Sequence, residues 1–142
     1  MITEKETILL KHLRQNSRKS LAKISEETSI PVSTLFDTLK KLESNVIVKH
    51  VSLLNFSKLG YSLKMCFAIS TKQKQELKGF LIQSQNVNSL SSLMNGYDFY
   101  IECIFKDFKE MTEFKENLEK FQIETIDETF IVDELKKEEF CV

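Results

Sequence analysis

Apolar residues in the first third of the chain recur at spacings of three and four, which is the period of amphipathic helices. Three stretches carry this period, marked by Leu9, Leu10 and Leu13, by Leu21, Ile24 and Thr28, and by Leu35, Leu39 and Leu42. A capping box of Thr3 and Glu6 predicts the start of the first helix. Pro31 predicts that the second stops near Ser29, and Asn45 is predicted to end the third in a left-handed conformation. The pattern therefore predicts three short consecutive helices.

A different pattern follows the third helix. The β-branched, alternating run VIVKHVSLLN predicts an edge strand or wing. Alternation returns from Tyr61 and predicts strands at YSLKMCFAIS, VNSLSSLM, YDFYIECIFK and IETIDETFIV. Thr71 is predicted to cap a helix after the first of these strands. Asn95-Gly96 predicts a hairpin before the third.

A last helix is predicted between the third and fourth strands. Asp107 and Glu110 form a second capping box at its start. Its apolar stripe, which we expect to be buried, consists of Phe108, Met111, Phe114, Leu118 and Phe121. The order of elements is βαββαβ, which is the split βαβ or ferredoxin-like arrangement.

The composition excludes several classes of protein. With 42% hydrophobic and 29% charged residues among 142, and no run of about 20 apolar residues, we expect a globular protein outside the membrane. The N-terminus has no secretory pattern, which favours the cytoplasm. Cys66, Cys103 and Cys141 lack zinc or CxxC spacing, so we expect buried, reduced thiols. Two histidines, without HExxH or a phosphate-binding glycine loop, predict no catalytic site, metal or cofactor.

Charge is distributed unevenly along the chain. Residues 1–55 contain nine Lys and Arg against six Asp and Glu, whereas residues 56–142 contain eleven against fifteen. A basic front half indicates an anionic partner. A solvated helical face explains the same residues almost as well.

An ordered set of motifs resembles the Lrp/AsnC family of feast/famine transcription regulators. The motifs are LLKHL, Arg18 with Ser20, Ser33-Thr34, KKLE, Asn45-Val46-Ile47, LNFSKLGYSL and NGYDFYI. The chain departs from the family pattern at Pro31, Thr38, Asn45, His50 and Phe56. The resemblance implies an α+β fold, with a winged helix-turn-helix in residues 1–50, a linker strand in 51–60, and a βαββαβ domain for effector binding and oligomerisation in 61–142.

The resemblance also implies partners, namely double-stranded DNA, an amino-acid effector, and further copies of the chain in homodimers, tetramers or octamers. Base contacts are expected from the exposed arc of the third helix, formed by Ser33, Thr34, Phe36 and Asp37. Phosphate contacts are expected from Arg18, Lys19, Lys40, Lys41, Lys49 and His50. Taken alone, the third helix is better interpreted as a packing helix. Phe36 has two open interpretations, contact with a thymine methyl or packing on a neighbouring helix.

The turn into the third strand is the expected effector site, again by resemblance. Its residues are Asn95, Gly96, Tyr97 and Asp98, joined by Thr129 on the last strand. A carboxylate such as that of Asp98 suits an ammonium group, and main-chain amides at a glycine turn suit a carboxylate. The alternative interpretation is a tight turn with no ligand.

Three hypotheses for function remain. The preferred one is a sequence-specific DNA-binding transcription regulator with an amino-acid or related effector. The enzyme alternative is a siroheme decarboxylase-like subunit of the same fold. The third, suggested by Thr38 and the modest basic charge, is an oligomerising partner without DNA binding.

Overall fold

The computed structural model describes residues 1–142, which form two compact units. The first comprises Met1–Leu53 together with Leu135–Val142, and the second comprises Leu54–Glu134. Sequence reasoning had assigned residues 61–142 to one domain, whereas the structure groups the last eight residues with the first unit. No helix combines the length and apolar character that a membrane span requires.

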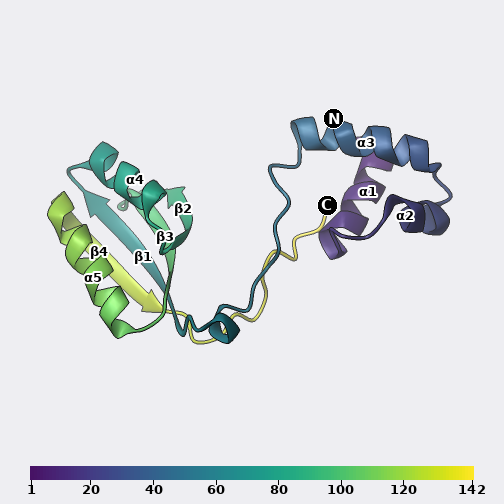
Figure 1. Cartoon of the computed structure of the whole chain (residues 1–142). Coiled ribbons are helices and arrows are strands. Elements are labelled where there is room, and N and C mark those ends of the chain that lie inside the picture. Colours follow the sequence, from purple (N-terminus) through teal and green to yellow (C-terminus); the bar gives the residue numbers. More distant parts are fainter. The chain divides into compact units, whose positions relative to one another are not determined.

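The first unit is built from three helices, α1 (Glu4–Gln15), α2 (Leu21–Thr28) and α3 (Val32–Asn45) (Figure 1). The capping box at α1 is confirmed, because the Thr3 hydroxyl accepts from the Glu6 amide and the Glu6 carboxylate accepts from the Thr3 amide. Ser29, with φ of 59°, ends α2 as predicted. The predicted stripes meet in one core of Leu9, Leu10, Ile24, Ile30, Leu35 and Leu42.

The end of α3 differs from the prediction. Asn45 is the last helical residue and does not adopt the left-handed conformation. Its side-chain amide donates instead to the carbonyl of Lys41 at 3.0 Å, and the amide of Ile47 donates to the carbonyl of Leu42. These bonds satisfy carbonyls at the end of the helix without a left-handed residue.

The predicted wing and linker strand are wrong. Residues 46–62 contain no strand, only a 3-10 helix at Phe56–Leu59. Val48 and Val51 are exposed, and no other segment of the chain pairs with this run. Strand propensity alone does not form a strand, because a ladder needs a partner for its amides and carbonyls. The first unit is therefore a helix-turn-helix without a wing.

The second unit confirms the βαββαβ order. It runs β1 (Leu63–Thr71), α4 (Lys74–Gln83), β2 (Val87–Ser92), β3 (Phe99–Phe105), α5 (Phe108–Leu118) and β4 (Ile123–Phe130). The strands form one antiparallel sheet in the order β2-β3-β1-β4. The Asn95-Gly96 hairpin is confirmed between β2 and β3, although its loop is longer than two residues.

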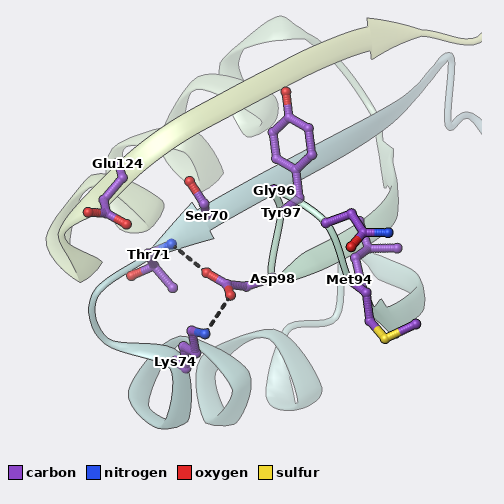
Figure 2. Close-up of a pocket in the computed structure, with 10 residues that line it drawn as sticks. Ser70, Thr71, Lys74, Met94, Gly96, Tyr97, Asp98 and Glu124 are labelled. Carbon is purple, nitrogen blue, oxygen red and sulfur yellow. Dashed lines mark hydrogen bonds and ion pairs between the residues drawn. The ribbon is translucent and has the colours of Figure 1, made fainter.

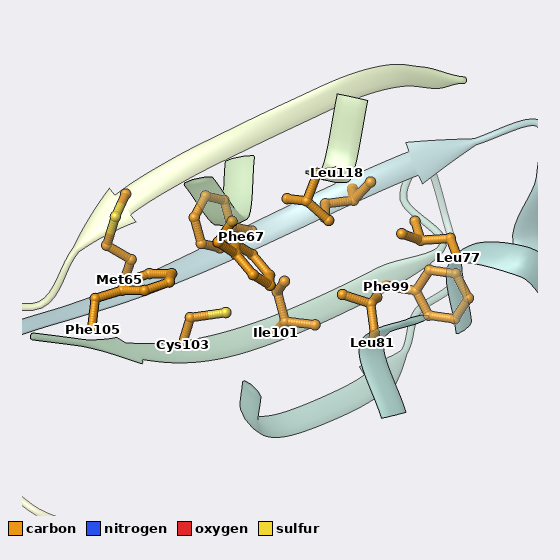
Figure 3. Packing of buried hydrophobic residues seen from close by; sticks show 11 residues of the cluster. Met65, Phe67, Leu77, Leu81, Phe99, Ile101, Cys103, Phe105 and Leu118 are labelled. Atoms are coloured by element: carbon orange, nitrogen blue, oxygen red, sulfur yellow. The ribbon is translucent and has the colours of Figure 1, made fainter. Parts of the chain in front are cut away.

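One face of this sheet carries the core (Figure 3). Alternate residues of β1 and β3, including Met65, Phe67 and Ile101, point to the face covered by both helices. Leu77 and Leu81 of α4 pack there, as do Phe114 and Leu118 of α5. The intervening residues of the strands lie on the opposite face, which no helix covers.

Some local predictions in this unit and the tail are wrong. Gln73, not Thr71, is the N-cap of α4. The buried Thr71 hydroxyl accepts from the Gln73 amide at 3.0 Å and donates to the carbonyl of Phe121, so it lies just before the helix. Phe108 is 63% exposed, because it occupies the first position of α5, and its ring lies edge-on to that of Phe130. Cys141 is exposed rather than buried because it lies in the C-terminal tail.

The second capping box is half formed. The Asp107 carboxylate accepts from the Glu110 amide at 2.9 Å. The Glu110 carboxylate, however, accepts from the amide of Lys106 at 2.6 Å, one residue before the cap. Asp107 therefore caps the start of α5 as expected, whereas the bond from the Glu110 carboxylate is made to the residue before the cap.

Candidate DNA-binding surface and effector pocket

Helix α3 separates a buried side from an exposed arc. Leu35 and Leu42 are buried in the core of the first unit. The predicted base-contact residues lie elsewhere on the helix, with Ser33, Phe36 and Asp37 exposed and Thr34 half-buried. The structure thus brings these residues together on the side of α3 that faces away from the core.

Lys40 continues this exposed arc. Its ammonium nitrogen lies 4.6 Å from the centroid of the Phe36 ring, one helical turn before it. This is a cation–π contact, which restrains the lysine without neutralising its charge. Lys40 is therefore held on the exposed side of α3 and remains available to an anion.

Lys41 is engaged inside the protein. Its ammonium lies 2.7 Å from a carboxylate oxygen of Glu6, a residue 5% exposed at the start of α1. This hydrogen bond, and then the bond from the Thr3 amide, lower the pKa of Glu6 to about 2. Lys41 therefore links α3 to α1, and a DNA phosphate must compete with Glu6 for it.

Two other predicted phosphate contacts also have internal partners. Lys19 forms an ion pair with Glu27 and lies 3.1 Å from Nδ1 of His12. The Lys19 ammonium lowers the pKa of Glu27. His50 Nε2 lies 3.1 Å from the carboxylate of Glu43.

The remaining predicted phosphate contacts are unpaired cations. Arg18, Lys40 and Lys49 are exposed, and none of them forms an ion pair within the chain. These three predicted phosphate contacts can therefore bind an anion without first breaking an ion pair inside the protein.

The hairpin turn has a specific backbone geometry. Asn95 and Gly96 both have positive φ, of 66° and 115°. The amide of Leu93 donates to the carbonyl of Asp98 at 2.8 Å and closes the loop. The amide of Asp98 in turn donates to the carbonyl of Ile69, which fastens the loop to the end of β1.

A pocket of about 420 Å³ opens beside this turn (Figure 2). Its lining consists of Ser70, Thr71, Lys74, Leu93, Met94, Asn95, Gly96, Tyr97, Asp98 and Glu124. The predicted turn residues therefore line a real concavity. Sequence reasoning missed Ser70, Lys74 and Glu124, because only the pairing of β1 with β3 and β4 brings them to the turn.

Asp98 is the central charged group of the pocket. Its carboxylate accepts from the Lys74 ammonium at 2.8 Å and from the Thr71 amide at 2.9 Å (Figure 2). These two bonds, that of Lys74 first, lower the pKa of Asp98, and Asp98 raises the pKa of Lys74. The carboxylate therefore already has a cationic partner, which a ligand ammonium would have to displace.

The other side of the turn is tied to the last strand. The Tyr97 hydroxyl donates to the carboxylate of Asp127 on β4, which raises the pKa of Tyr97. Thr129, also on β4, is exposed and pairs in register with Cys66. It is not among the residues that line the pocket, so the structure does not bring it together with the turn.

Sequence comparison relates the chain to known regulators. No protein-family model matches it. An uncharacterized HTH-type transcriptional regulator of Pyrococcus abyssi is 25% identical over 143 aligned positions, covering 99% of this chain and 97% of the relative. HTH-type transcriptional regulator FL11 of the same organism is 28% identical over 109 residues, covering 75% of this chain and 72% of FL11.

Solved structures share the fold over nearly the whole chain. A transcriptional regulator of Neisseria meningitidis, in complex with L-Met, matches with a TM-score of 0.86 and 19% identity, covering 96% of this chain and 94% of that one. An AsnC family transcriptional regulator from Agrobacterium tumefaciens matches with a TM-score of 0.84 and 15% identity, with the same coverage. The leucine response regulatory protein of Mycobacterium tuberculosis has a TM-score of 0.82 at 15% identity, covering 96% and 97%.

The chain is thus a homologue of HTH-type transcriptional regulators and has the fold of the Lrp/AsnC regulators. This confirms the preferred hypothesis from the sequence, a transcription regulator rather than an enzyme, since these relatives are regulators and none is a decarboxylase. The helix-turn-helix named in the descriptions of these relatives is a DNA-binding motif, so DNA is the partner of a regulator of this class.

Proposed function

We propose that this regulator binds DNA in a sequence-specific manner by placing α3 in the major groove. The observation that carries the proposal is the exposed arc of Ser33, Phe36 and Asp37 on a helix whose other side is fixed in the core. In a helix-turn-helix, the N-terminal part of the second helix contacts base edges. Hydroxyl groups suit several bases there, and a carboxylate accepts from cytosine N4.

The phosphate contacts of this proposal fall into two groups. Arg18, Lys40 and Lys49 carry unpaired charge and meet phosphates directly. Lys19, Lys41 and His50 contribute only after leaving Glu27, Glu6 and Glu43. Each unpaired cation that neutralises a phosphate releases counterions, so binding weakens steeply with salt.

Selection from random double-stranded DNA tests this proposal. The wild type is expected to enrich a defined site, whereas a Lys40→Ala/Lys49→Ala variant binds that site more weakly at physiological salt. Lys78→Ala/Lys109→Ala is the matched control, because both lysines are exposed on helices of the second unit. Failure of the wild type to enrich any sequence would support the alternative of an oligomerising partner without DNA binding.

We further propose that homodimers form through the helix-free face of the sheet and that they assemble further into tetramers or octamers. This face contains Ala68 and the exposed ring of Tyr100, which pair in register, with Asp127 on the other side of Ala68. The exposed Tyr100 ring and the neighbouring Ala68 give this face apolar surface that a second copy of the chain can bury. Sedimentation equilibrium of Ala68→Arg is expected to give monomers, whereas Lys78→Arg, on α4, keeps the wild-type mass.

An effector function is proposed for the pocket at the turn. Support comes from its paired charges of both signs, Lys74 and Asp98, and from the Neisseria neighbour, whose structure contains L-Met. A zwitterionic amino acid offers a carboxylate to Lys74 and an ammonium to Asp98 or Glu124. It therefore replaces one ion pair by two, whereas a ligand with a single charge leaves one group unpaired.

Calorimetric titration tests the effector proposal. An amino acid from a complete panel is expected to bind, and its analogues lacking either the carboxylate or the amine are expected not to bind. Lys74→Met should abolish the signal, and Lys78→Met, one turn further along α4 and outside the pocket, should keep it. If no amino acid binds the wild type, the turn is structural and the effector proposal fails.

A further inference from the structure

Helix α3 carries an apolar row that the core does not use. Val32 and Phe36 lie one helical turn apart and are 45% and 47% exposed. The partly buried residues that pack against the core of this unit are Ile8, Leu13, Leu21, Leu39 and Ile47. Val32 and Phe36 are not members of that set, and nearly half of each side chain is open to solvent.

A polar row runs beside the apolar one. Ser33 and Asp37 are also one turn apart, each directly after a member of the apolar row, and both are exposed. Lys40 continues the apolar row by one more turn, with its ammonium over the Phe36 ring. The exposed part of α3 therefore presents two chemically distinct rows, one apolar and one hydrogen-bonding, which end in a cation.

We infer that Val32 and Phe36 select thymine at two positions of the operator by contact with its C5-methyl groups. The inference rests on the proposed DNA-binding function and specifies which bases the apolar row selects. Thymine alone among the four bases presents an apolar group in the major groove. An exposed valine and an exposed phenyl ring bury that methyl without any hydrogen bond, whereas Ser33 and Asp37 contact polar edges next to it.

The surroundings of the apolar row favour DNA over a second protein as the occupant. Two side chains form a small patch, far below the several hundred Å² typical of protein docking surfaces. Lys40 stands at one end of the row and needs an anion, which a phosphate beside a contacted base provides. A second copy of the chain would instead have to bury this unpaired cation together with Asp37.

The test removes single methyl groups from the DNA. After selection of a site with the wild-type protein, each thymine is replaced in turn by deoxyuridine, which changes nothing but the methyl, and the dissociation constant is measured by fluorescence anisotropy. Replacement at two thymines is expected to weaken wild-type binding by about three- to five-fold each, as burial of one methyl group predicts. Other thymines are expected to be insensitive.

Protein variants assign each methyl to its side chain. Phe36→Ala should weaken binding to the thymine site and remove the thymine-deoxyuridine difference at one position, and Val32→Ala should do so at the other. Phe36→Leu should retain part of the difference, because leucine still offers an apolar surface. Ile82→Ala is the matched control, an exposed apolar residue on α4, and should leave both differences intact.

The possible outcomes distinguish failure of the thymine inference from failure of the proposed DNA-binding function. If the wild type selects no site, the proposed DNA-binding function fails and the inference fails with it. If a site is selected but no deoxyuridine weakens binding, or the difference persists in both alanine variants, only the inference is overturned. A changed sedimentation mass in Phe36→Ala would also overturn it, since the row would then contact another copy of the chain.

Discussion

The ammonium of Lys41 lies 2.7 Å from the carboxylate of Glu6, so the C-terminal half of α3 is joined to the first turn of α1. The same carboxylate closes the capping box with Thr3. One acidic side chain therefore caps the start of α1 and holds α3 against it. Its charge affects both the stability of the first unit and the freedom of Lys41 to meet an anion.

Glu6→Gln is expected to lower the thermal midpoint of unfolding at pH 7. Since the folded-state pKa of about 2 lies below the ordinary value of 4.5, the stabilisation is fully present above about pH 4.5. It is lost as the pH falls from there toward 2, so wild type and variant should converge in acid. Glu4→Gln, exposed in the same first turn, is the control and should show no such pH-dependent gap.

Lys40→Ala is expected to reduce the slope of log binding constant against log salt by roughly 0.9, the value for one lost phosphate contact. Lys41→Ala should reduce the slope less, because its ammonium is already engaged by Glu6. Binding to operator and unrelated DNA should weaken alike. A loss confined to one base position, with the slope intact, would contradict the phosphate assignment of Lys40.

Ser33→Ala should relax base preference at one or two operator positions. A mismatch at a contacted position costs about 1–3 kcal/mol, and the variant should lose that penalty where the hydroxyl made contact. Competition binding with a set of single-base operator variants measures it. Uniform weakening across the set would place Ser33 on the DNA backbone instead.

Asp98→Asn is expected to abolish the amino-acid response while keeping the dimer and its affinity for one operator. The hairpin should survive, because backbone bonds from Leu93 and to Ile69 hold the loop. Glu113→Gln is the control, since this carboxylate is exposed on α5 and does not line the pocket. Sedimentation and footprinting with and without the bound amino acid measure the response, and a full response in Asp98→Asn would contradict the role of this carboxylate.

Truncating one buried side chain in each core should show whether the two units unfold independently. Phe67→Ala is expected to cost about 3–5 kcal/mol and Leu9→Ala about 2–5 kcal/mol, because both side chains are fully buried. The chain has three tyrosines, all in the second unit, so tyrosine fluorescence reports that unit alone. Leu9→Ala should shift the circular dichroism transition in urea but not the fluorescence transition. Coincident shifts would mean that the units unfold together.

The spacing of apolar residues correctly predicted the helices, because their formation depends mainly on residues close together in the sequence. Leu35 and Leu42 of the stripe on α3 are buried as expected, and so are Phe114 and Leu118 of the stripe on α5, since the spacing of apolar residues selects both the helix and its inward side. Phe108, at the start of the second stripe, is the exception. Local hydrogen bonding proved harder to foresee. The side chain of Asn45 donates to the Lys41 carbonyl, and the residue does not adopt the left-handed conformation. No sequence pattern distinguishes these two ways of ending a helix.

Features that depend on pairing between distant segments could not be predicted from the sequence. Lys74 and Asp98 are 24 positions apart, and their ion pair exists because Asp98 is hydrogen-bonded to the end of β1. The run from Val46 to Asn55 has strand-like composition, yet the chain supplies no neighbouring strand for it. In both cases the deciding partner is remote, and composition near the residue carries no information about it.

The C-terminal tail has a practical consequence for dissecting the regulator. The Arg14 guanidinium on α1 donates to the carbonyls of Phe140, at 2.9 Å, and Glu138, at 2.7 Å, so residues 135–142 belong to the unit that carries α3. A fragment that stops at residue 53 therefore omits part of its own unit. A label attached near Glu138 or Phe140 would disturb the contacts with α1, so a label for immobilisation is better engineered into an exposed position of the second unit.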